Sequence, residues 1–486
     1  MRRFFPLLGL IGLVVGGLRA APGLPPEASP RNGWPHVAAR LVAGREITVA
    51  FLGGSITAAH GWRPGILDHL RTAYPKSRFT ELVAAVPGTG SDYGAARLRA
   101  EVLGHEPDLL FVEFAVNDTG RDPVSIARSM EGIVRQTRRL SPRTDLAFVY
   151  TLSAAGLPEL DGAGRFPPPA IAMEKVARHY DVPTVHLGVE VVRRLRAGTL
   201  TFAGDEPAAN TILFTHDKIH PTDAGHRIYT EVLARHVLAA GSASATPALP
   251  APLDPLHHEG ARLVPLAEIA GADDLAAWRL IAGDDPRLHP VSAARRRPTW
   301  FAERPGRVLG FSFEGSGFGF VGLKGPDAGR FRVVVDDRAP VEATLFDDFC
   351  VAGRYRIRPW FYPAELAPGR HTVRIELLAE GPDKSSVRRR SAPAGDPAFD
   401  RHVLTLSELI IVGPPDEAEP AFTPTPPHET PPPPLRPPPA RTTARPPHGR
   451  SGRGGHPSRL GILRLSRRRH RRHPLHQQRH RGRPTG

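Results

Sequence analysis

Residues 48–57, Thr-Val-Ala-Phe-Leu-Gly-Gly-Ser-Ile-Thr, decide the fold of this chain of 486 residues. The run that ends at residue 52 is short, apolar and rich in β-formers, which is typical of a buried parallel strand. Gly53 and Gly54 end the strand, and Ser55 follows where the backbone must turn toward a helix. The ligand crevice of an α/β sheet lies at this place, so Ser55 is a candidate for chemistry. The alternative is an ordinary β-α loop with a capping serine.

Segments with strand and helix character alternate from residue 47 to residue 240. Alternation at this spacing is typical of βαβ units, in which helices cover a parallel sheet on both faces. Right-handed crossovers leave few topologies, and a five-stranded doubly wound sheet is the simplest of them. The expected strands are 47–52, 79–84, 108–116, 145–152 and 182–187, and the expected helices are 64–73, 94–103, 123–140, 168–180 and 222–240.

A domain of a different class is expected after the α/β domain at 45–240. Residues 241–259 are rich in Ser, Ala and Pro and are expected to form a linker. From 260 to 413 the pattern has the period of strands, with turns that contain Gly and Pro, which predicts an all-β sandwich or jelly roll. The expected strands are 308–314, 318–323, 330–335, 341–346, 371–378 and 403–412, and the polar stretch 379–401 is expected to be a long loop.

The two ends of the chain differ from the rest in composition. Residues 1–21 begin with Arg2 and Arg3, continue with an apolar run from Phe4 to Leu18 and end in small residues, which is the pattern of a secretory signal peptide; an uncleaved anchor is the alternative. We therefore expect a secreted or periplasmic protein with no membrane span in its mature form. Residues 414–486 hold 15 arginines and four acidic residues, so they carry +11 of the net charge of +15. This composition predicts a disordered tail.

The tail has two interpretations. Its arginines and histidines would attract a polyanion or a cell surface without selectivity. Alternatively, the tail is an anomalous translation of GC-rich sequence, for example past a frameshift. No specific nucleic-acid partner is expected, because the charge of the rest of the chain is unremarkable.

Four short segments hold the residue types that an acyl-transfer site needs. Ser55 is the candidate nucleophile. Gly88 lies in a glycine-rich loop after the second strand, where backbone N–H groups can approach a ligand closely. Asn117 ends the third strand, and its amide can donate a hydrogen bond into the same crevice. The fourth segment, Asp217-Lys-Ile-His220-Pro, precedes the last helix of the domain.

Each of these segments also has a plainer interpretation: a glycine turn, a helix cap at Asn117-Asp118, a surface acid, or a solvated loop histidine. Taken together they favour a catalytic site, because the first three strands of a doubly wound sheet deliver three of them to one edge. At a spacing of three residues, Asp217 can fix the tautomer of His220, whose Nε2 then faces Ser55 as a general base. The Ser55 N–H, the Gly88 N–H and the Asn117 side chain would form the oxyanion hole.

The chain resembles the SGNH (GDSL-type) hydrolase superfamily over residues 45–240. The similarity lies in four blocks in the family order: Gly53-Gly-Ser-Ile-Thr57, Gly88, Asn117 in Val-Asn-Asp, and Asp217-x-x-His220-Pro221. Gly54 replaces an acid that is usual in the first block, and residues 83–86 lack the asparagine often found before the second. The resemblance implies a three-layer α/β/α fold, flavodoxin-like in its parallel sheet, and hydrolysis of carboxylic esters without a metal or cofactor.

The β domain is similar to galactose-binding-type jelly rolls, which often accompany carbohydrate-active enzymes. A serine esterase that removes acetyl or other short acyl groups from a polysaccharide or glycoside is therefore expected. Trp360, Phe361 and Tyr362 are either sugar-stacking residues or core and interface aromatics. The rival functions are a lipase or thioesterase of the same superfamily, with 198–216 able to move over the site, and a non-catalytic carbohydrate-binding surface protein.

Overall fold

A computed structural model describes residues 22–237, 249–269, 275–276, 278–281, 285–289, 291, 295–393 and 395–415. All of these residues belong to one compact unit. The predicted signal peptide, residues 241–248 of the expected linker, and the predicted tail from residue 416 onward lie outside the described residues. None of the helices in the described ranges has the length and apolar character that a membrane span needs.

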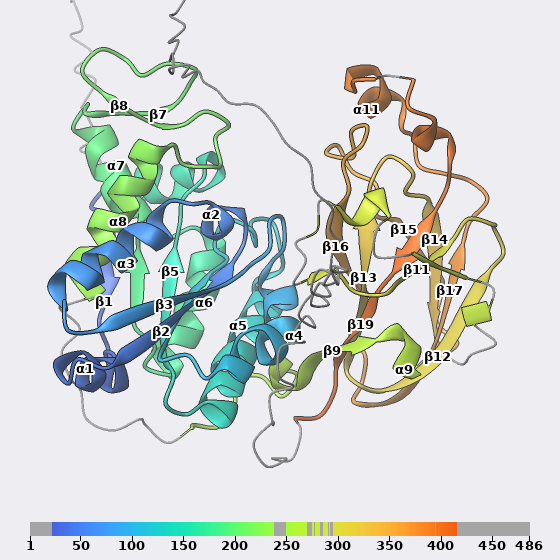
Figure 1. Cartoon of the computed structure of the whole chain (residues 1–486), viewed down its shortest axis with the longest axis horizontal. Coiled ribbons are helices and arrows are strands. Elements are labelled where there is room, and N and C mark those ends of the chain that lie inside the picture. The colour runs from blue at the N-terminus through green and yellow to red at the C-terminus, as the bar shows by residue number, and fades with distance from the viewer. Residues whose placement is uncertain are drawn as a thin grey trace, which may run out of the picture. The chain divides into compact units, whose positions relative to one another are not determined.

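A six-stranded sheet forms the centre of the α/β region, residues 22–237 (Figure 1). The strand order is β1-β6-β5-β4-β2-β3, and every neighbouring pair is parallel except β1 with β6. The chain changes its winding direction between β2 and β4, as a doubly wound sheet requires. The strands are β1 (Ala28–Ser29), β2 (Glu46–Gly53), β3 (Arg78–Ala85), β4 (Leu109–Glu113), β5 (Asp145–Tyr150) and β6 (Thr184–His186).

Helices cover both faces of this sheet, because successive side chains of a buried strand point to opposite faces. In β2, Ala50 and Leu52 join one apolar core with α4, α5 and α6, whereas Val49 and Phe51 join the other with α1, α3, α7 and α8. The helices are α1 (Pro35–Val42), α2 (Ser55–Ala58), α3 (Trp62–Ala73), α4 (Ser91–Glu101), α5 (Pro123–Leu140), α6 (Pro168–His179), α7 (Gly188–Arg196) and α8 (Asp223–Val237). Strands β7 (Leu200–Ala203) and β8 (Ile212–Thr215) form a separate parallel pair.

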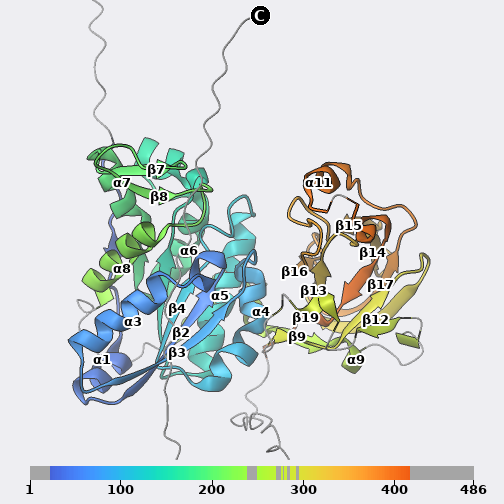
Figure 2. The ribbon, with the colours of Figure 1, turned by 45° about the horizontal axis from the view of Figure 1, so that its top comes forward.

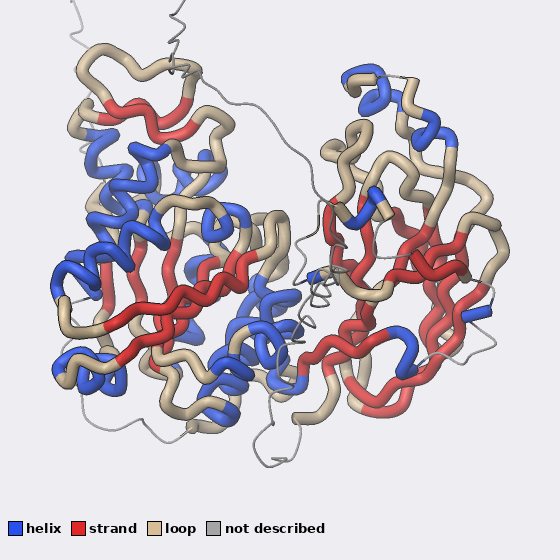
Figure 3. The backbone as a smooth tube through the Cα atoms, in the orientation of Figure 1, coloured by secondary structure: helices blue, strands red, loops and turns tan. Residues whose placement is uncertain are grey.

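Antiparallel strands build the β region, residues 261–412 (Figures 2 and 3). Two four-stranded sheets, β12-β17-β14-β15 and β16-β13-β19-β9, enclose an apolar core, and a third sheet is β10-β11-β18. The strands are β9 (Ala261–Pro265), β10 (Arg279–Ile281), β11 (Thr299–Ala302), β12 (Val308–Gly315), β13 (Gly317–Lys324), β14 (Arg330–Val335), β15 (Val341–Thr344), β16 (Arg356–Phe361), β17 (Gly369–Leu377), β18 (Leu404–Leu406) and β19 (Glu408–Val412); the helices are α9 (Leu266–Ile269) and α11 (Ser385–Arg390).

The structure confirms the predicted fold class, an α/β sheet of parallel strands followed by an antiparallel β sandwich. The α/β sheet has six strands where five are expected, because the short β1 adds an antiparallel strand at the edge beside β6. The expectation of a long loop at 379–401 is wrong in part, because α11 lies within it. Lys384, just before α11, is buried and donates from Nζ to the carbonyl of Arg401 at 2.7 Å. This contact folds a polar segment back onto the sandwich.

The aromatic triplet at 360–362 packs against the apolar cores, with Trp360 and Phe361 half-buried. The ring of Trp360 lies 5.3 Å from that of Phe320 and 5.4 Å from that of Phe331. Phe361 packs against the core that contains α4 and α5, and Tyr362 is buried. These three residues are therefore core and interface aromatics, the second of the two alternatives above.

A buried carboxyl from the sheet caps α1. The side chain of Trp34, at the N-cap position, makes no capping hydrogen bond, so the first N–H groups of α1 need other acceptors. Asp145 of β5 accepts from the Val37 N–H at 2.8 Å and also from that of His36. Burial raises the pKa of Asp145 to about 7, although these hydrogen bonds oppose the shift.

This raised pKa predicts a pH-dependent stability. Between its ordinary pKa and about 7, the folded protein holds the Asp145 proton more tightly than the unfolded chain does. Rising pH therefore removes stability from the wild type, but not from Asp145→Asn, which retains a capping oxygen. As the pH rises through 4.5, 6 and 7.5, the melting temperature of the wild type should fall relative to that of the variant. A constant difference, or one that favours the wild type at higher pH, would contradict this assignment.

Candidate active site

Three adjacent strands of the sheet end at the same edge and deliver three of the predicted site residues. Ser55 follows β2, Gly88 follows β3, and Asn117 follows β4. β2 lies between the other two, with Gly53 paired to Ala85 on one side and to Glu113 on the other. The change of winding direction between β2 and β4 opens the ligand crevice of such sheets at this place.

Ser55 and the Asp217–His220 segment meet at this edge. His220 Nδ1 lies 2.6 Å from Asp217 Oδ2, and His220 Nε2 lies 2.8 Å from Ser55 Oγ. With the Nδ1 proton donated to the carboxylate, Nε2 can accept the hydroxyl proton of Ser55. The geometry is that of a serine–histidine–acid triad. Ser55 is not the N-cap residue of α2, because it is the first residue of the helix and Gly54 takes the N-cap position.

The loop that carries His220 is held by its own backbone. Asp217 Oδ1 accepts from the N–H groups of Ile219 and His220 at 2.9 and 2.7 Å. Lys218 has a φ of 71°, which turns the chain so that these donors face one carboxylate. Its carbonyl also accepts from the Ala154 N–H at 2.9 Å, which fastens the loop to the segment after β5.

These contacts also set the charge state of Asp217. Partial burial acts to raise the pKa of Asp217, but the hydrogen bonds from the side chain and backbone of His220 and from Ile219 outweigh it and lower the pKa below the ordinary value. The carboxylate therefore stays ionised at neutral pH. An ionised partner stabilises the imidazolium that forms when His220 takes up a proton.

His216 takes no part in this arrangement. The Nδ1 atom of His216 lies 3.1 Å from the carbonyl oxygen of Gly204, whereas the two ring nitrogens of His220 contact Asp217 and Ser55. The described part of the chain contains no group of three or more His, Cys, Asp or Glu side chains suited to hold a metal ion.

The Asn117 amide lies against the turn before Ser55. A Cβ atom on Gly54 would come within 1.9 Å of Asn117 Oδ1 and 2.8 Å of its Nδ2. The amide therefore occupies the space that a side chain at position 54 would need. This close approach gives a physical reason for glycine in place of the acid that is usual there.

The two glycines of the second block serve different purposes. Gly88 has a φ of 73°, which favours glycine, and nothing lies within 4 Å of the position that its Cβ would take. At Gly90 a Cβ would lie 2.4 Å from Asp118 Oδ1. Gly88 is thus exposed with open space around its Cβ position, whereas Gly90 makes room for the buried carboxyl group of Asp118.

A buried ionic cluster that the sequence analysis missed joins the second and third blocks. Asp118 accepts from the Ser91 N–H at 3.1 Å and from Arg121 Nη1 at 3.0 Å, and Arg121 Nη2 lies 2.7 Å from Asp92. Burial raises the pKa of Asp92 to about 6. Helix α5 is capped instead by Asp122, which accepts from the Ser125 N–H. The signal for the cluster was the acid next to Asn117, interpreted as a helix cap.

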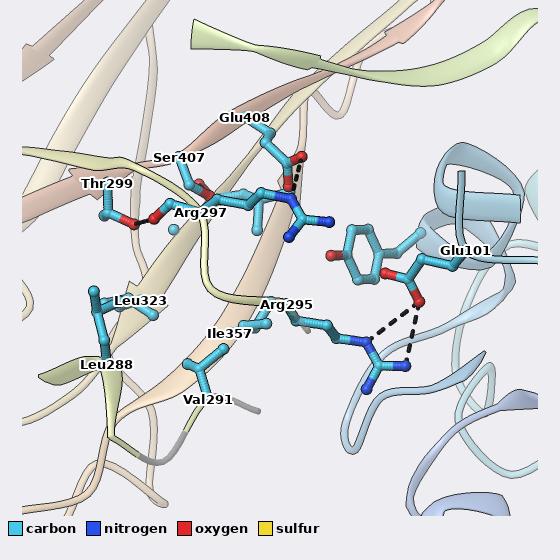
Figure 4. Close-up of a pocket in the computed structure, with 13 residues that line it drawn as sticks. Glu101, Leu288, Val291, Arg295, Arg297, Thr299, Leu323, Ile357, Ser407 and Glu408 are labelled. Atoms are coloured by element: carbon cyan, nitrogen blue, oxygen red, sulfur yellow. Dashed lines mark hydrogen bonds and ion pairs between the residues drawn. The ribbon is translucent and has the colours of Figure 1, made fainter. Parts of the chain in front are cut away.

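A pocket elsewhere in the structure is too small for an ester substrate. Tyr93 and Glu101 of α4 and several residues of the β region line it, and the ion pairs Arg295–Glu101 and Arg297–Glu408 cross it (Figure 4). Its volume is about 20 Å³, which is room for one water molecule and not for a sugar.

Comparisons with known proteins identify a family domain in the α/β region. The family model of GDSL-like lipases and acylhydrolases matches residues 51–228, which contain Ser55, Gly88, Asn117, Asp217 and His220. Among curated proteins the chain has no match.

Two solved structures resemble the chain over both its regions. Both are of a two-domain esterase (CEX) active on acetylated mannans, one co-crystallised with mannopentaose. Each is 21% identical in sequence to this chain. The match to the first covers 78% of this chain and 93% of the solved chain, with a TM-score of 0.60. The match to the second covers 78% of this chain and 94% of the solved chain, with a TM-score of 0.59. At this identity the likeness shows the fold. The family match shows that residues 51–228 are a GDSL-like lipase/acylhydrolase domain and that the chain is a carboxylic ester hydrolase.

Proposed function

We propose that the chain is a secreted serine esterase that removes acetyl or other short acyl groups from a polysaccharide or glycoside. The observation that carries the proposal is the continuous hydrogen-bonded path from Ser55 Oγ through His220 to Asp217. In this role, Ser55 attacks the ester carbonyl while His220 takes the hydroxyl proton and returns it to the leaving alcohol. Water, activated by the same histidine, then releases the acyl group from Ser55.

The oxyanion of each tetrahedral intermediate needs hydrogen-bond donors in the same crevice. We assign this role to the N–H groups of Ser55 and Gly88 and to the amide of Asn117. The positions of these residues at the ends of three adjacent strands support the assignment. A donor of this kind typically contributes about 3 kcal/mol of transition-state stabilisation.

Two observations favour a carbohydrate ester. The side chains of His220 and Asp217 are 46% and 54% exposed, so the triad lies in an open site that an acyl group on a polymer can reach. The solved structures that share both regions belong to an esterase active on acetylated mannans. The alternative functions are a lipase or thioesterase and a non-catalytic carbohydrate-binding surface protein. The experiments below distinguish both from a carbohydrate esterase.

The proposed domain boundaries are those that the sequence analysis predicts. We propose a signal peptide at 1–21, an esterase domain at 45–240, a linker at 241–259, a β domain at 260–413 and a basic tail at 414–486. In this scheme the protein is exported, and the tail contacts polyanions or the cell surface. Deletion of 414–486 should then abolish polyanion binding and leave ester hydrolysis intact.

Acetate release from a panel of acetylated polysaccharides and simple aryl esters tests the proposed function. The wild type should release acetate, and Ser55→Ala should release none above background. The preferred polymer names the substrate class, while a preference for long-chain or thiol esters would indicate the lipase or thioesterase. Absence of release from every ester, in a folded protein that binds sugars, would overturn the proposal in favour of the binding protein.

Substitutions at the base and at its partner should differ in severity. His220→Ala should lower kcat by about 10⁶-fold, because no general base remains. Asp217→Asn should cost about 10⁴-fold, since the histidine is still present but its tautomer is no longer fixed. Steady-state kinetics on an aryl acetate measures both. Near-normal turnover by His220→Ala would refute the assignment of the base.

Gly54→Ala tests the placement of Asn117. The added methyl group meets the end of a flexible side chain, so the fold should persist while the amide moves away from the crevice. We expect kcat to fall by about 100-fold, as for loss of one oxyanion donor. The matched control is Gly104→Ala, whose Cβ would meet only the Arg99 carbonyl oxygen at 3.6 Å. Equal kcat values for the two variants would contradict the role of Asn117.

A further inference from the structure

Helix α2, which begins at Ser55, needs support from outside itself. It has four residues, and its N-cap residue Gly54 has no side chain to accept from its first N–H groups. A helix of this length is far too short to be stable alone. Two buried charged side chains, Glu113 and Arg63, contact its two ends.

Glu113 lies beneath the start of α2. It ends β4, in register with Gly53, and is completely buried. Its Oε2 accepts from Thr57 Oγ1 at 2.7 Å, and its Oε1 accepts from Thr151 Oγ1 at 2.6 Å. The Gly54 N–H, one residue before the nucleophile, also donates to this carboxyl group. Glu113 thus fastens the turn before Ser55 and the side chain two residues after it.

Burying the Glu113 carboxyl group costs free energy of folding. Burial raises the pKa of Glu113, although the hydrogen bonds from Thr151, Thr57 and Gly54 oppose the shift. A buried carboxyl group lowers stability unless its hydrogen bonds are satisfied, and such groups are concentrated at functional sites. Nothing in the triad or in the proposed oxyanion hole uses Glu113.

Arg63 holds the other end of α2. The last carbonyl groups of a helix have no partner within the helix. The Arg63 guanidinium donates from Nε to the carbonyl of Thr57 and from Nη2 to those of Ala58 and Ala59, both at 3.3 Å. It is itself buried, lies 5.7 Å from the ring centre of Phe51, and forms an ion pair with Glu81.

We propose that Glu113 and Arg63 are positioning residues that hold α2 from both ends through Thr57 and so keep Ser55 Oγ at hydrogen-bond distance from His220 Nε2. The inference rests on the proposed role of Ser55 as nucleophile. Since reacting groups must be aligned closely, a small movement of α2 lowers the rate without weakening substrate binding.

Thr57→Val tests this inference with little change in side-chain volume. The variant loses the hydroxyl that joins α2 to Glu113, and Thr57→Ser retains it. The matched control is Thr137→Val: Thr137 is also buried, and its hydroxyl donates to the Ile133 carbonyl at 2.8 Å within α5, away from the site. Wild type, all three variants and Ser55→Ala are compared by kcat and KM on an aryl acetate, and by melting temperature.

The expected result is a kcat for Thr57→Val that is about 10- to 100-fold below the wild type, with KM unchanged. Thr57→Ser should recover most of this loss, and Thr137→Val should retain full turnover at a similar cost in melting temperature. Full turnover by Thr57→Val, or equal losses in Thr57→Val and Thr137→Val, would overturn the inference. Activity that persists in Ser55→Ala would instead refute the proposed nucleophile, so the two failures are distinguishable.

Discussion

The parallel pairing of β2 with β3 and β4 is the constraint on which the site depends. This pairing brings Gly53, Ala85 and Glu113 level at one edge of the sheet. The loops after the three strands must then share the same crevice, and each contributes one residue to it. A shift of β2 by one residue would also turn Phe51 and Leu52 to the wrong faces, so the two apolar cores and the site enforce the same register.

Close contacts beneath the site position its residues, while the side chains of His220 and Asp217 stay open to solvent. The side chains of His220 and Asp217 are about half exposed, while the groups beneath the site are buried: Glu113 under α2, and Asp118 beside Asn117. Buried carboxyl groups with fixed donors resist movement, because each displaced hydrogen bond leaves a polar group unsatisfied in a medium of low dielectric constant. An open surface over a rigid base suits an enzyme that acts on an ester group carried by a large molecule.

The sequence predicted the parts of the fold that depend on long periodic segments. Helix α5 matches its predicted bounds, and the five predicted strands form the parallel part of the sheet. Short or irregular elements escaped prediction for physical reasons. Helix α2 is too short to show a period, and β16 contains Pro359, which is uncommon within a strand, together with two arginines.

For the site, the spacing of Asp217 and His220 predicted their hydrogen bond, since a single turn brings the two side chains together. The supporting groups could not be found in this way. Glu113 is 56 residues from Thr57 in the sequence, and the pairing of β4 with β2 brings it there. Arg63 is six residues from Thr57, in the first turn of α3, but no sequence pattern marks its contact with the Thr57 carbonyl.

The central claim is that Ser55 is a nucleophile activated by His220. Covalent labelling with a fluorophosphonate, followed by peptide mass spectrometry, tests it most directly. The account predicts one adduct, on Ser55, that forms in step with the loss of ester hydrolysis and forms far more slowly in His220→Ala. An adduct on another residue, or hydrolysis that continues after Ser55 is fully labelled, would contradict it.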